Sequence, residues 1–271
     1  MSLYAVIGDP ISHSKSPLIH SLFAEQTNQD VTYIAQRVQE ENFDEFVRNF
    51  FLKGGSGLNI TLPHKYRAYK LAQSCDLSSK TAKAANTLYQ NNSGQLCAAN
   101  TDGKGLVIDI KLNKDTEIRG KDLLLLGAGG AISGALPALI DENPSSITIV
   151  NRSITKANTL KKNLGSIAPI ETYSYEDLTG DFDIIINGTS LSLSDELPPI
   201  RESNIRRDAL CYDMFYKDTK TAFERWAASS QAGLVSNGLG MLVEQAAESF
   251  LVWTGIRPST LEVLRKIRKA V

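Results

Sequence analysis

The sequence has no excess of charge of either sign. Its 271 residues contain 29 Lys and Arg against 30 Asp and Glu, which gives a formal net charge of −1 at pH 7. Such a balance provides no field to attract nucleic acid or an anionic membrane, so we expect neither as a partner. No apolar run approaches the length that spans a bilayer. The N-terminus leads directly into a strand pattern, without the basic and long apolar regions of a signal peptide.

Cysteine and histidine are also scarce. The cysteines are Cys75, Cys97 and Cys211, an odd number at wide spacing, which favours reduced thiols and a cytoplasmic protein. The 3 histidines do not combine with cysteines or carboxylates at metal-ligand spacing, so we predict no metal site. The 42% hydrophobic and 22% charged residues are typical of a globular protein with one or two domains.

The strongest local motif is a glycine turn after an apolar strand. Residues 121–131 read Lys-Asp-Leu-Leu-Leu-Leu-Gly-Ala-Gly-Gly-Ala, and four consecutive leucines are typical of a strand buried on both faces. Residues 131–140 can continue as a helix, whose free N–H groups and dipole would bind an anion. Gly127 and Gly129 match the dinucleotide fingerprint, but its third glycine position holds Ile132. An ordinary strand–helix turn is the alternative interpretation.

The end of the next strand indicates which dinucleotide binds. Residues 146–150 form a β-branched run that ends in Asn151-Arg152-Ser153, with Lys156 close behind. An NAD site uses a carboxylate here, whereas the 2′-phosphate of NADP needs cationic and hydroxyl donors. Arg152 offers a planar fork for phosphate, and Ser153 can cap the following helix while facing the same anion. Arg152 could be a solvated surface residue, but its position favours NADP.

Several polar residues lie where helices are expected to begin. Ser16 precedes a proline and starts a helix, which explains Ser16 but not Ser14. Lys65 falls in the first turn of a helix that Pro63 opens, where the helix dipole disfavours a cation. A solvated lysine is the simpler interpretation of Lys65. Asp102 also has a structural interpretation, as an N-cap or first-turn carboxylate.

Taken together, these motifs resemble the shikimate dehydrogenase family. The matching segments are 14–17, 59–65, 86–87, 100–103, 127–131, 151–152, 212–214 and 238–242. Each motif is weak alone, but their occurrence in order over nearly the whole chain is highly specific. Members of this family reduce 3-dehydroshikimate to shikimate with NADPH, on the route to chorismate and the aromatic amino acids.

The resemblance implies an α/β fold of two domains separated by a cleft. An N-terminal α/β substrate-binding domain would comprise residues 1–101 and be completed by C-terminal helices in residues 238–271. A Rossmann-like NADP-binding domain would comprise residues 102–237. Hydride transfer is then expected in the cleft between the domains. The expected partner is a small-molecule substrate, shikimate or 3-dehydroshikimate, and a homodimer is compatible with the sequence.

The resemblance also assigns site residues, with Lys65 and Asp102 as the catalytic pair. The residues implied to bind substrate are Ser14, Ser16, Thr61, Lys65, Asn86, Asp102, Tyr216 and Gln245. The residues implied to bind the cofactor are Gly127, Ala128, Gly129, Gly130, Ala131, Asn151, Arg152, Ser153, Lys156, Thr189, Met214 and Gly238. The chain departs from the common family pattern at Ser153 and Lys156, which replace Thr and Arg, and at Asn237, which replaces Asp.

The residue types suit reduction of a ketone. Hydride addition leaves a developing alkoxide, which the Lys65 ammonium group can stabilise and protonate, while Asp102 orients Lys65 and binds a ring hydroxyl. Two alternatives are a quinate/shikimate dehydrogenase that uses NAD or NADP, and a non-catalytic NADP-binding sensor on the same fold. Arg152 argues against a preference for NAD. The presence of both Lys65 and Asp102 argues against a sensor, which needs no proton donor.

Overall fold

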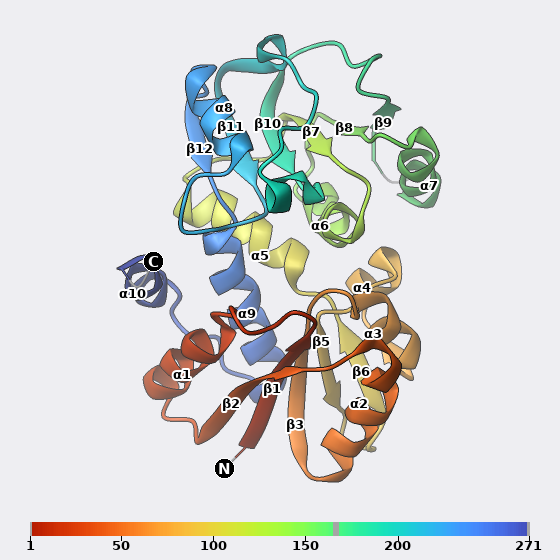
Figure 1. Ribbon diagram of the computed structural model, residues 1–271, viewed down its shortest axis with the longest axis vertical. Coiled ribbons are helices and arrows are strands. Elements are labelled where there is room, and N and C mark those ends of the chain that lie inside the picture. The colour runs from red at the N-terminus through yellow and green to blue at the C-terminus, as the bar shows by residue number, and fades with distance from the viewer. Residues whose placement is uncertain (1, 165–167, 270–271) are drawn as a thin grey trace. The chain divides into compact units, whose positions relative to one another are not determined.

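The chain forms an α/β structure that divides into two compact units (Figure 1). The computed structural model describes residues 2–164 and 168–269. The parts of the predicted domains outside this description are residues 1, 165–167, 270 and 271. Unit 1 comprises Met1–Gly105 and Leu242–Val271, and unit 2 comprises Leu106–Met241. Within the described residues, no helix is long and apolar enough to cross a membrane.

Unit 2 contains a parallel sheet with the strand order β12-β11-β10-β7-β8-β9. Its strands are β7 (Asp122–Leu126), β8 (Ser146–Val150), β9 (Ile170–Tyr173), β10 (Phe182–Asn187), β11 (Ile205–Asp213) and β12 (Leu234–Ser236). Its main helices are α6 (Gly130–Asp141), α7 (Ile154–Leu164) and α8 (Ala222–Ser229). If β7 to β12 are renumbered 1 to 6 in chain order, the strand order read from β9 is 3-2-1-4-5-6. This is the doubly wound arrangement of dinucleotide-binding folds. The predicted Rossmann-like fold is therefore confirmed.

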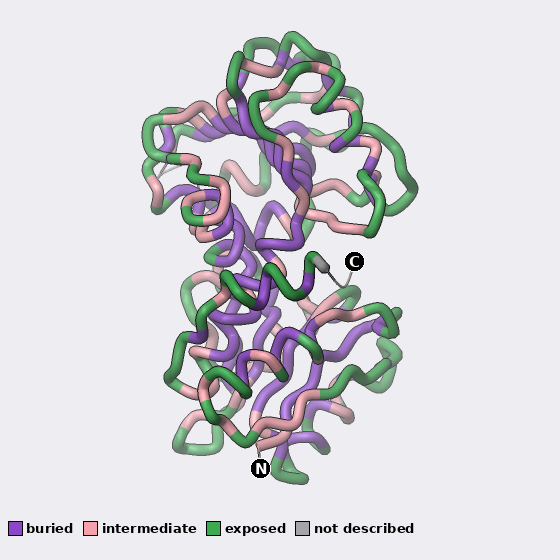
Figure 2. Tube along the Cα trace, turned by 90° about the vertical axis from the view of Figure 1, so that its left-hand side faces the viewer, coloured by how far each residue is buried: buried purple, intermediate pink, exposed green. Residues whose placement is uncertain are grey.

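The leucines of β7 are buried on both faces of this sheet, as the sequence predicted. Leu123 and Leu125 belong to a core cluster that includes residues of α6. Leu124 and Leu126 belong to a second cluster that includes residues of α8. Successive residues of a strand point to opposite faces, so an uninterrupted apolar run fits a strand covered on both sides. Figure 2 shows that both units contain buried segments of chain.

Unit 1 contains a mixed sheet with the strand order β2-β1-β3-β5-β6-β4. Its strands are β1 (Ser2–Gly8), β2 (Val31–Arg37), β3 (Gly55–Ile60), β4 (Ser74–Cys75), β5 (Thr87–Gln90) and β6 (Leu96–Ala99). Its helices are α1 (Ser16–Thr27), α2 (Phe43–Leu52), α3 (Lys65–Leu71), α4 (Leu77–Ala82) and α10 (Leu261–Lys269), with parts of α5 (Asp102–Ile108) and α9 (Leu239–Thr254). The pair β5–β6 is an antiparallel hairpin that turns at residues 91–94.

Two aromatic-rich layers cover the unit 1 sheet. On one side, Phe43 and Phe50 of α2 pack in a cluster with Ile7 of β1 and Leu58 of β3. A second group of rings includes Trp253 of α9, which stacks on Tyr4 with centroids 4.7 Å apart. Aromatic side chains bury large apolar areas, so these layers hold α2 and α9 against the strands.

The units end at residues 105 and 241, whereas the sequence placed the boundaries after residues 101 and 237. Close packing at two glycines accounts for the difference. A Cβ atom on Gly105 would lie 2.6 Å from the backbone nitrogen of Gln245, so the start of α5 is fixed to α9 within unit 1. A Cβ atom on Gly240 would overlap the Asp109 carboxylate, so the start of α9 is fixed within unit 2. Such contacts cannot be read from motif order.

Candidate active site

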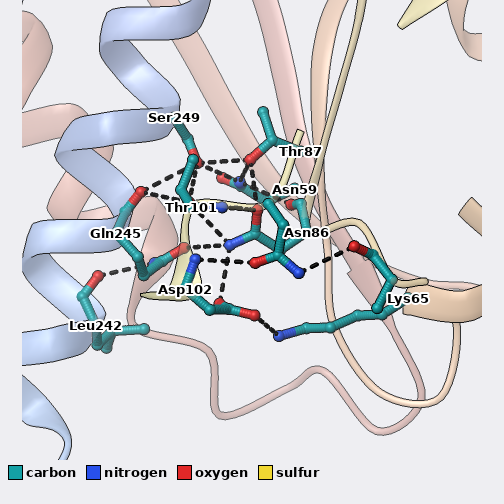
Figure 3. A network of polar contacts seen from close by, with 11 residues as sticks. Asn59, Lys65, Asn86, Thr87, Thr101, Asp102, Leu242, Gln245 and Ser249 are labelled. Atoms are coloured by element: carbon teal, nitrogen blue, oxygen red, sulfur yellow. Dashed lines mark hydrogen bonds and ion pairs between the residues drawn. The ribbon is translucent and has the colours of Figure 1, made fainter. Parts of the chain in front are cut away.

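The ammonium group of Lys65 meets the carboxylate of Asp102 in unit 1 (Figure 3). Nζ of Lys65 lies 2.6 Å from Oδ2 of Asp102, and the exposed fractions of the two side chains are 26% and 8%. The contact expected between these residues is therefore present. A partly exposed cation beside a buried carboxylate leaves a donor that a bound ligand can reach, because the ammonium group carries two further N–H bonds.

A turn delivers Lys65 to this position. The backbone N–H of His64 donates to the carbonyl of Thr61 at 3.0 Å, so the chain leaves β3 through a tight turn. Helix α3 begins at Lys65 rather than at Pro63, which corrects the predicted start of the helix. The carbonyl of Lys65 accepts from the N–H of Ala85 at 2.9 Å, which ties the start of α3 to the segment before β5.

The side chain of Asn86 holds Asp102 from the opposite side. Its Nδ2 atom lies 2.9 Å from Oδ1 of Asp102, 2.9 Å from Oγ1 of Thr101 and 3.2 Å from Oε1 of Gln245. Its Oδ1 atom accepts from the backbone N–H of Thr101 at 2.9 Å. Lys65, Asn86, Asp102 and Gln245, predicted from resemblance, thus form one connected network that joins α3, the residue before β5, α5 and α9.

Asn59, Thr87 and Ser249 extend this network and were missed in the sequence. Nδ2 of Asn59 lies 3.0 Å from Oγ of Ser249, which is 2.8 Å from Oγ1 of Thr87. The Tyr33 hydroxyl donates to Oδ1 of Asn59 at 2.7 Å, and burial raises the pKa of Tyr33 well above its usual value. Ser249 follows Gln245 by one helical turn, a spacing that could have identified it.

The other predicted substrate residues lie in separate segments. The backbone N–H of Ser16 at the start of α1 donates to Oγ of Ser14 at 3.3 Å. Thr61 follows β3, and its N–H donates to the carbonyl of Ile7 at 3.0 Å. Tyr216 belongs to unit 2, in the segment after β11, and burial raises the pKa of its hydroxyl. The network around Asp102 therefore includes part of the predicted set, and Ser14, Ser16, Thr61 and Tyr216 stand outside its direct contacts.

In unit 2, the glycine turn joins β7 to α6. Gly127 has a φ of +102°, a left-handed value that favours glycine. No neighbouring atom lies within 4 Å of where a Cβ would stand on Gly129 or Gly130. Helix α6 begins at Gly130, and its first turn carries no acidic residue. The N-terminus of a helix of this length, with open space in front of it, suits a phosphate group.

The remaining predicted cofactor residues also follow strands of the parallel sheet. Arg152 and Lys156 are exposed beyond β8, where Nδ2 of Asn151 donates to the carbonyl of Ser153 at 2.9 Å. Among the described residues, the Arg152 guanidinium pairs with no carboxylate. Thr189, Met214 and Gly238 follow β10, β11 and β12. In a doubly wound sheet, ligands bind beyond the carboxyl ends of the strands.

Among residues 2–164 and 168–269, possible metal ligands do not gather. Within the residues that the structure describes, no group of three or more His, Cys, Asp or Glu side chains could hold a metal ion. The sulfur atoms of Cys75, Cys97 and Cys211 are free. The polar network of unit 1 and the glycine turn of unit 2 are the two candidate functional sites.

Family models match three parts of the chain. The model of the shikimate dehydrogenase substrate binding domain matches residues 6–88, that of shikimate/quinate 5-dehydrogenase matches residues 109–205, and that of the shikimate 5′-dehydrogenase C-terminal domain matches residues 238–268. The fold is thus that of a two-domain α/β dehydrogenase with a dinucleotide-binding unit.

Known proteins resemble this chain over nearly its whole length and theirs. The shikimate dehydrogenase (NADP(+)) of Marinobacter nauticus is 47% identical over 98% of both chains, and that of Alkalilimnicola ehrlichii is 46% identical over 98% of both. The chain belongs to the shikimate dehydrogenase family.

Solved structures agree with this assignment. The Ael1 enzyme from Pseudomonas putida is 41% identical, with a TM-score of 0.93 over 98% of both chains. The shikimate 5-dehydrogenase of Thermus thermophilus, solved in complex with NADP(H) and shikimate, is 26% identical with a TM-score of 0.89 over 100% of both chains. The structure of 5-ketofructose reductase from Gluconobacter, 26% identical with a TM-score of 0.86, has the same fold. Reductases of different substrates share this fold, so the fold alone does not determine the substrate.

Proposed function

We propose that this protein catalyses the reversible, NADPH-dependent reduction of 3-dehydroshikimate to shikimate. The observation that carries the proposal is the pair of Lys65 and Asp102, whose polar atoms are 2.6 Å apart. Relatives that are 46–47% identical over nearly the full length are NADP-dependent shikimate dehydrogenases, which supports the same reaction and the same cofactor. The reaction supplies shikimate for the synthesis of chorismate and the aromatic amino acids.

In this mechanism Lys65 acts as the proton donor. NADPH, when bound, would supply the hydride that reduces the carbonyl group of the substrate, whose oxygen would gain negative charge. Nζ of Lys65 donates a hydrogen bond to that oxygen and then its proton, and solvent returns a proton to the amine. In the reverse direction the amine takes the proton from the hydroxyl group of shikimate.

Asp102 orients Lys65 and binds a hydroxyl of the substrate ring. Its Oδ2 atom accepts from Lys65, and its Oδ1 atom lies 2.9 Å from Nδ2 of Asn86. Each oxygen of a carboxylate can accept a second hydrogen bond, which leaves capacity for a ligand hydroxyl. Ser14, Ser16, Thr61, Asn86, Gln245 and Tyr216 are proposed to bind the carboxylate and the other hydroxyls of the substrate.

Unit 2 has the features that an NADP site requires. The open positions at Gly129 and Gly130 and the N-terminus of α6 would hold the pyrophosphate. Arg152, with Ser153 and Lys156, would bind the 2′-phosphate. Residues 127–131, Asn151, Thr189, Met214 and Gly238 would complete the cofactor site. We accordingly propose that unit 1 supplies most of the residues that bind the substrate and that unit 2 supplies the residues that bind the cofactor.

Initial rates of the purified enzyme with shikimate and with quinate, each with NADP+ and with NAD+, test this function. We expect the highest kcat/KM for shikimate with NADP+. A higher value for quinate, or for NAD+, would instead assign the quinate/shikimate alternative. NADP+ binding without turnover of either substrate would assign the non-catalytic sensor. Because 5-ketofructose reductase shares the fold, a ketose should be included as a further substrate.

We also infer the setting in which the enzyme works. Three free cysteines, of which Cys97 and Cys211 are buried, suit a reducing compartment such as the cytoplasm. Its partners would be small molecules only. A homodimer is the assembly to test, by light scattering of the purified protein with and without NADP+.

A further inference from the structure

The loops that follow β10, β11 and β12 in unit 2 each carry one residue of the proposed cofactor site. These residues are Thr189, Met214 and Gly238. The glycine turn after β7 and Arg152 after β8 would take the pyrophosphate and the 2′-phosphate of the adenosine half. A dinucleotide crosses the sheet at the switch point between β7 and β10. The loops after β10, β11 and β12 therefore lie where the nicotinamide half would bind.

Asp213, the last residue of β11, joins these loops through its buried carboxylate. The residue is 0% exposed. Its Oδ2 atom accepts from the hydroxyl groups of Ser192 and Thr221, both at 2.7 Å. Its Oδ1 atom accepts from the N–H of Phe215 at 3.1 Å and from Nδ2 of Asn187 at 3.3 Å. The donors belong to the last residue of β10, to the loops after β10 and β11, and to the residue that caps α8.

One arm of this network reaches Thr189. Oδ1 of Asn187 accepts from the hydroxyl of Thr189 at 2.8 Å and from its backbone N–H at 3.1 Å. The carbonyl of Asn187 accepts from the N–H of Met214 at 2.9 Å. Asn187 is 0% exposed, so its amide is held in one orientation by these partners and by Asp213.

The other arm reaches the loop after β12. Thr221 and Glu224 form a capping box at the start of α8, in which the hydroxyl of Thr221 accepts from the N–H of Glu224 at 3.1 Å. Nδ2 of Asn237 donates to Oε1 of Glu224 at 3.4 Å, and Oδ1 of Asn237 accepts from the N–H of Leu239 at 3.2 Å. The N–H of Gly238 donates to the carbonyl of Phe215 at 3.1 Å, which closes the network.

The Asp213 carboxylate accepts these hydrogen bonds from neutral donors. Within the described residues, no Lys, Arg or His pairs with this carboxylate, and burial raises its pKa while the Ser192 and Thr221 hydroxyls oppose that change. A buried carboxylate without a counter-ion costs stability unless hydrogen bonds satisfy it. A residue that served only packing would be apolar at this buried position. A carboxylate, unlike an apolar side chain, fixes the positions of the groups that donate hydrogen bonds to it.

We propose that Asp213 is a positioning residue that holds Thr189, Met214 and Gly238 in the arrangement that binds the nicotinamide half of the cofactor. The proposal rests on the proposed function of unit 2 as the NADP site. It predicts that loss of this carboxylate weakens contacts to the nicotinamide half and spares contacts to the adenosine half.

The test compares two ligands by isothermal titration calorimetry on the full-length protein. One ligand is NADP+, and the other is adenosine 2′,5′-bisphosphate, which lacks the nicotinamide half. Asp213→Asn replaces one carboxylate oxygen with an amide group that cannot accept from Ser192 and Thr221. We expect its Kd for NADP+ to rise about tenfold, as expected for loss of a charge-assisted hydrogen bond, and its Kd for the bisphosphate to stay within about twofold.

Ser192→Ala is a second variant, which removes one of the hydroxyl groups that donate to Oδ2 of Asp213 at 2.7 Å. The same selective loss of NADP+ affinity is expected, so the proposal stays testable if Asp213→Asn fails to fold. Asp122→Asn is the matched control. Asp122 accepts from Ser146 at 2.7 Å and from Arg206 at 3.1 Å at the opposite end of β7, away from the cofactor loops. This control should bind both ligands as the wild type does.

Two results would overturn the proposal. Unchanged NADP+ affinity in both variants would show that the network does not position the loops. An equal loss of affinity for both ligands would show a general structural role only. Because binding is measured without substrate, the two proposals can fail separately. A wild-type protein that binds NADP+ but does not turn over shikimate would refute the proposed reaction, and the comparison of the two ligands would still test the role of Asp213.

Discussion

Lys65 and Asp102 lie 37 residues apart in the sequence, yet Nζ of the first is 2.6 Å from Oδ2 of the second. The antiparallel hairpin of β5 and β6 separates them along the chain and returns the chain to the edge of the sheet where β3 ends. In the proposed mechanism, the pair combines a proton donor with a group that fixes the donor's direction.

Replacement of this lysine should remove catalysis and leave cofactor binding intact. For Lys65→Ala we expect kcat for shikimate oxidation to fall by about 10²- to 10⁴-fold, the usual contribution of a positioned general acid or base. The Kd for NADP+ should stay unchanged, because the proposed cofactor residues lie in unit 2. Stopped-flow or steady-state rates and calorimetry provide the two measurements. Lys70→Ala, an exposed lysine of the same helix, is the control. Near wild-type turnover in Lys65→Ala would exclude the proposed role.

Arg152 should determine the preference for NADPH over NADH. Loss of a charge-assisted contact to the 2′-phosphate costs about 1.5–3 kcal/mol, or about 10- to 100-fold in affinity. We therefore expect Arg152→Ala to raise KM for NADPH by this factor and to leave KM for NADH unchanged. Lys162→Ala, an exposed lysine in the last turn of α7, should change neither value. Equal losses for both cofactors would contradict a phosphate contact by Arg152.

Gly105 should be essential for the position of Gln245. A Cβ atom at residue 105 would lie 2.6 Å from the backbone nitrogen and 2.7 Å from Cβ of Gln245, so one helix has to move away from the other. For Gly105→Ala we expect the free energy of unfolding to fall by about 1–3 kcal/mol, as in other overpacked sites. KM for shikimate should rise as well, whereas NADP+ affinity should not change.

Lys104→Ala provides the control for this substitution. Lys104 is adjacent to Gly105 in α5, and its side chain is 62% exposed. The free energy of unfolding of this variant, measured by chemical denaturation, and its steady-state rates should be close to those of the wild type. If Gly105→Ala has wild-type stability and KM, the close approach of α5 and α9 is not needed to form the site.

His20 should make the stability of the protein depend on pH. This residue of α1 is 0% exposed and stacks on Tyr33 with ring centroids 4.1 Å apart. Burial lowers the pKa of His20 from 6.5 to about 3, partly opposed by Asn59. As the pH falls below 6.5, the unfolded chain takes up a proton that the folded chain does not, so folding stability decreases until the pH reaches the folded-state pKa.

The predicted loss is about 2 kcal/mol between pH 7.5 and pH 5, from about 1.36 kcal/mol per pH unit below the unfolded-state pKa. In His20→Phe this part of the pH dependence should disappear. Phe23→Leu is the control, because it loosens the same cluster without removing the histidine and should lower stability equally at both pH values. Urea unfolding at pH 7.5 and pH 5 measures the effect, and an unchanged difference in His20→Phe would contradict it.

The parallel sheet of unit 2 could be predicted from the sequence because its signals are local. Leu123 to Leu126 are contiguous, and both faces of β7 are covered, so burial and pattern agree. The glycine turn could also be predicted from a local signal. Gly127 has a left-handed backbone conformation that few other residues adopt.

The members of the polar network around Asp102 could be predicted only by resemblance, because long-range side-chain contacts have no local pattern. Oγ of Ser249 meets Nδ2 of Asn59 across 190 positions of the chain, and nothing near either residue indicates the other. Asp213 was missed for a related reason. A carboxylate at a strand end is usually exposed or binds a ligand, and only the structure reveals that neutral donors surround it.

Unit 1 is built from two segments of the chain that lie on either side of unit 2. This arrangement fixes the order in which the two units can be completed during translation. Unit 2 is a continuous stretch, Leu106–Met241, whereas unit 1 needs Leu242–Val271 to join residues made far earlier. The polar network around Asp102 includes Gln245 and Ser249, so it forms only after these residues have been made. A ribosome that stops after residue 241 releases a chain with unit 2 complete and this network unfinished.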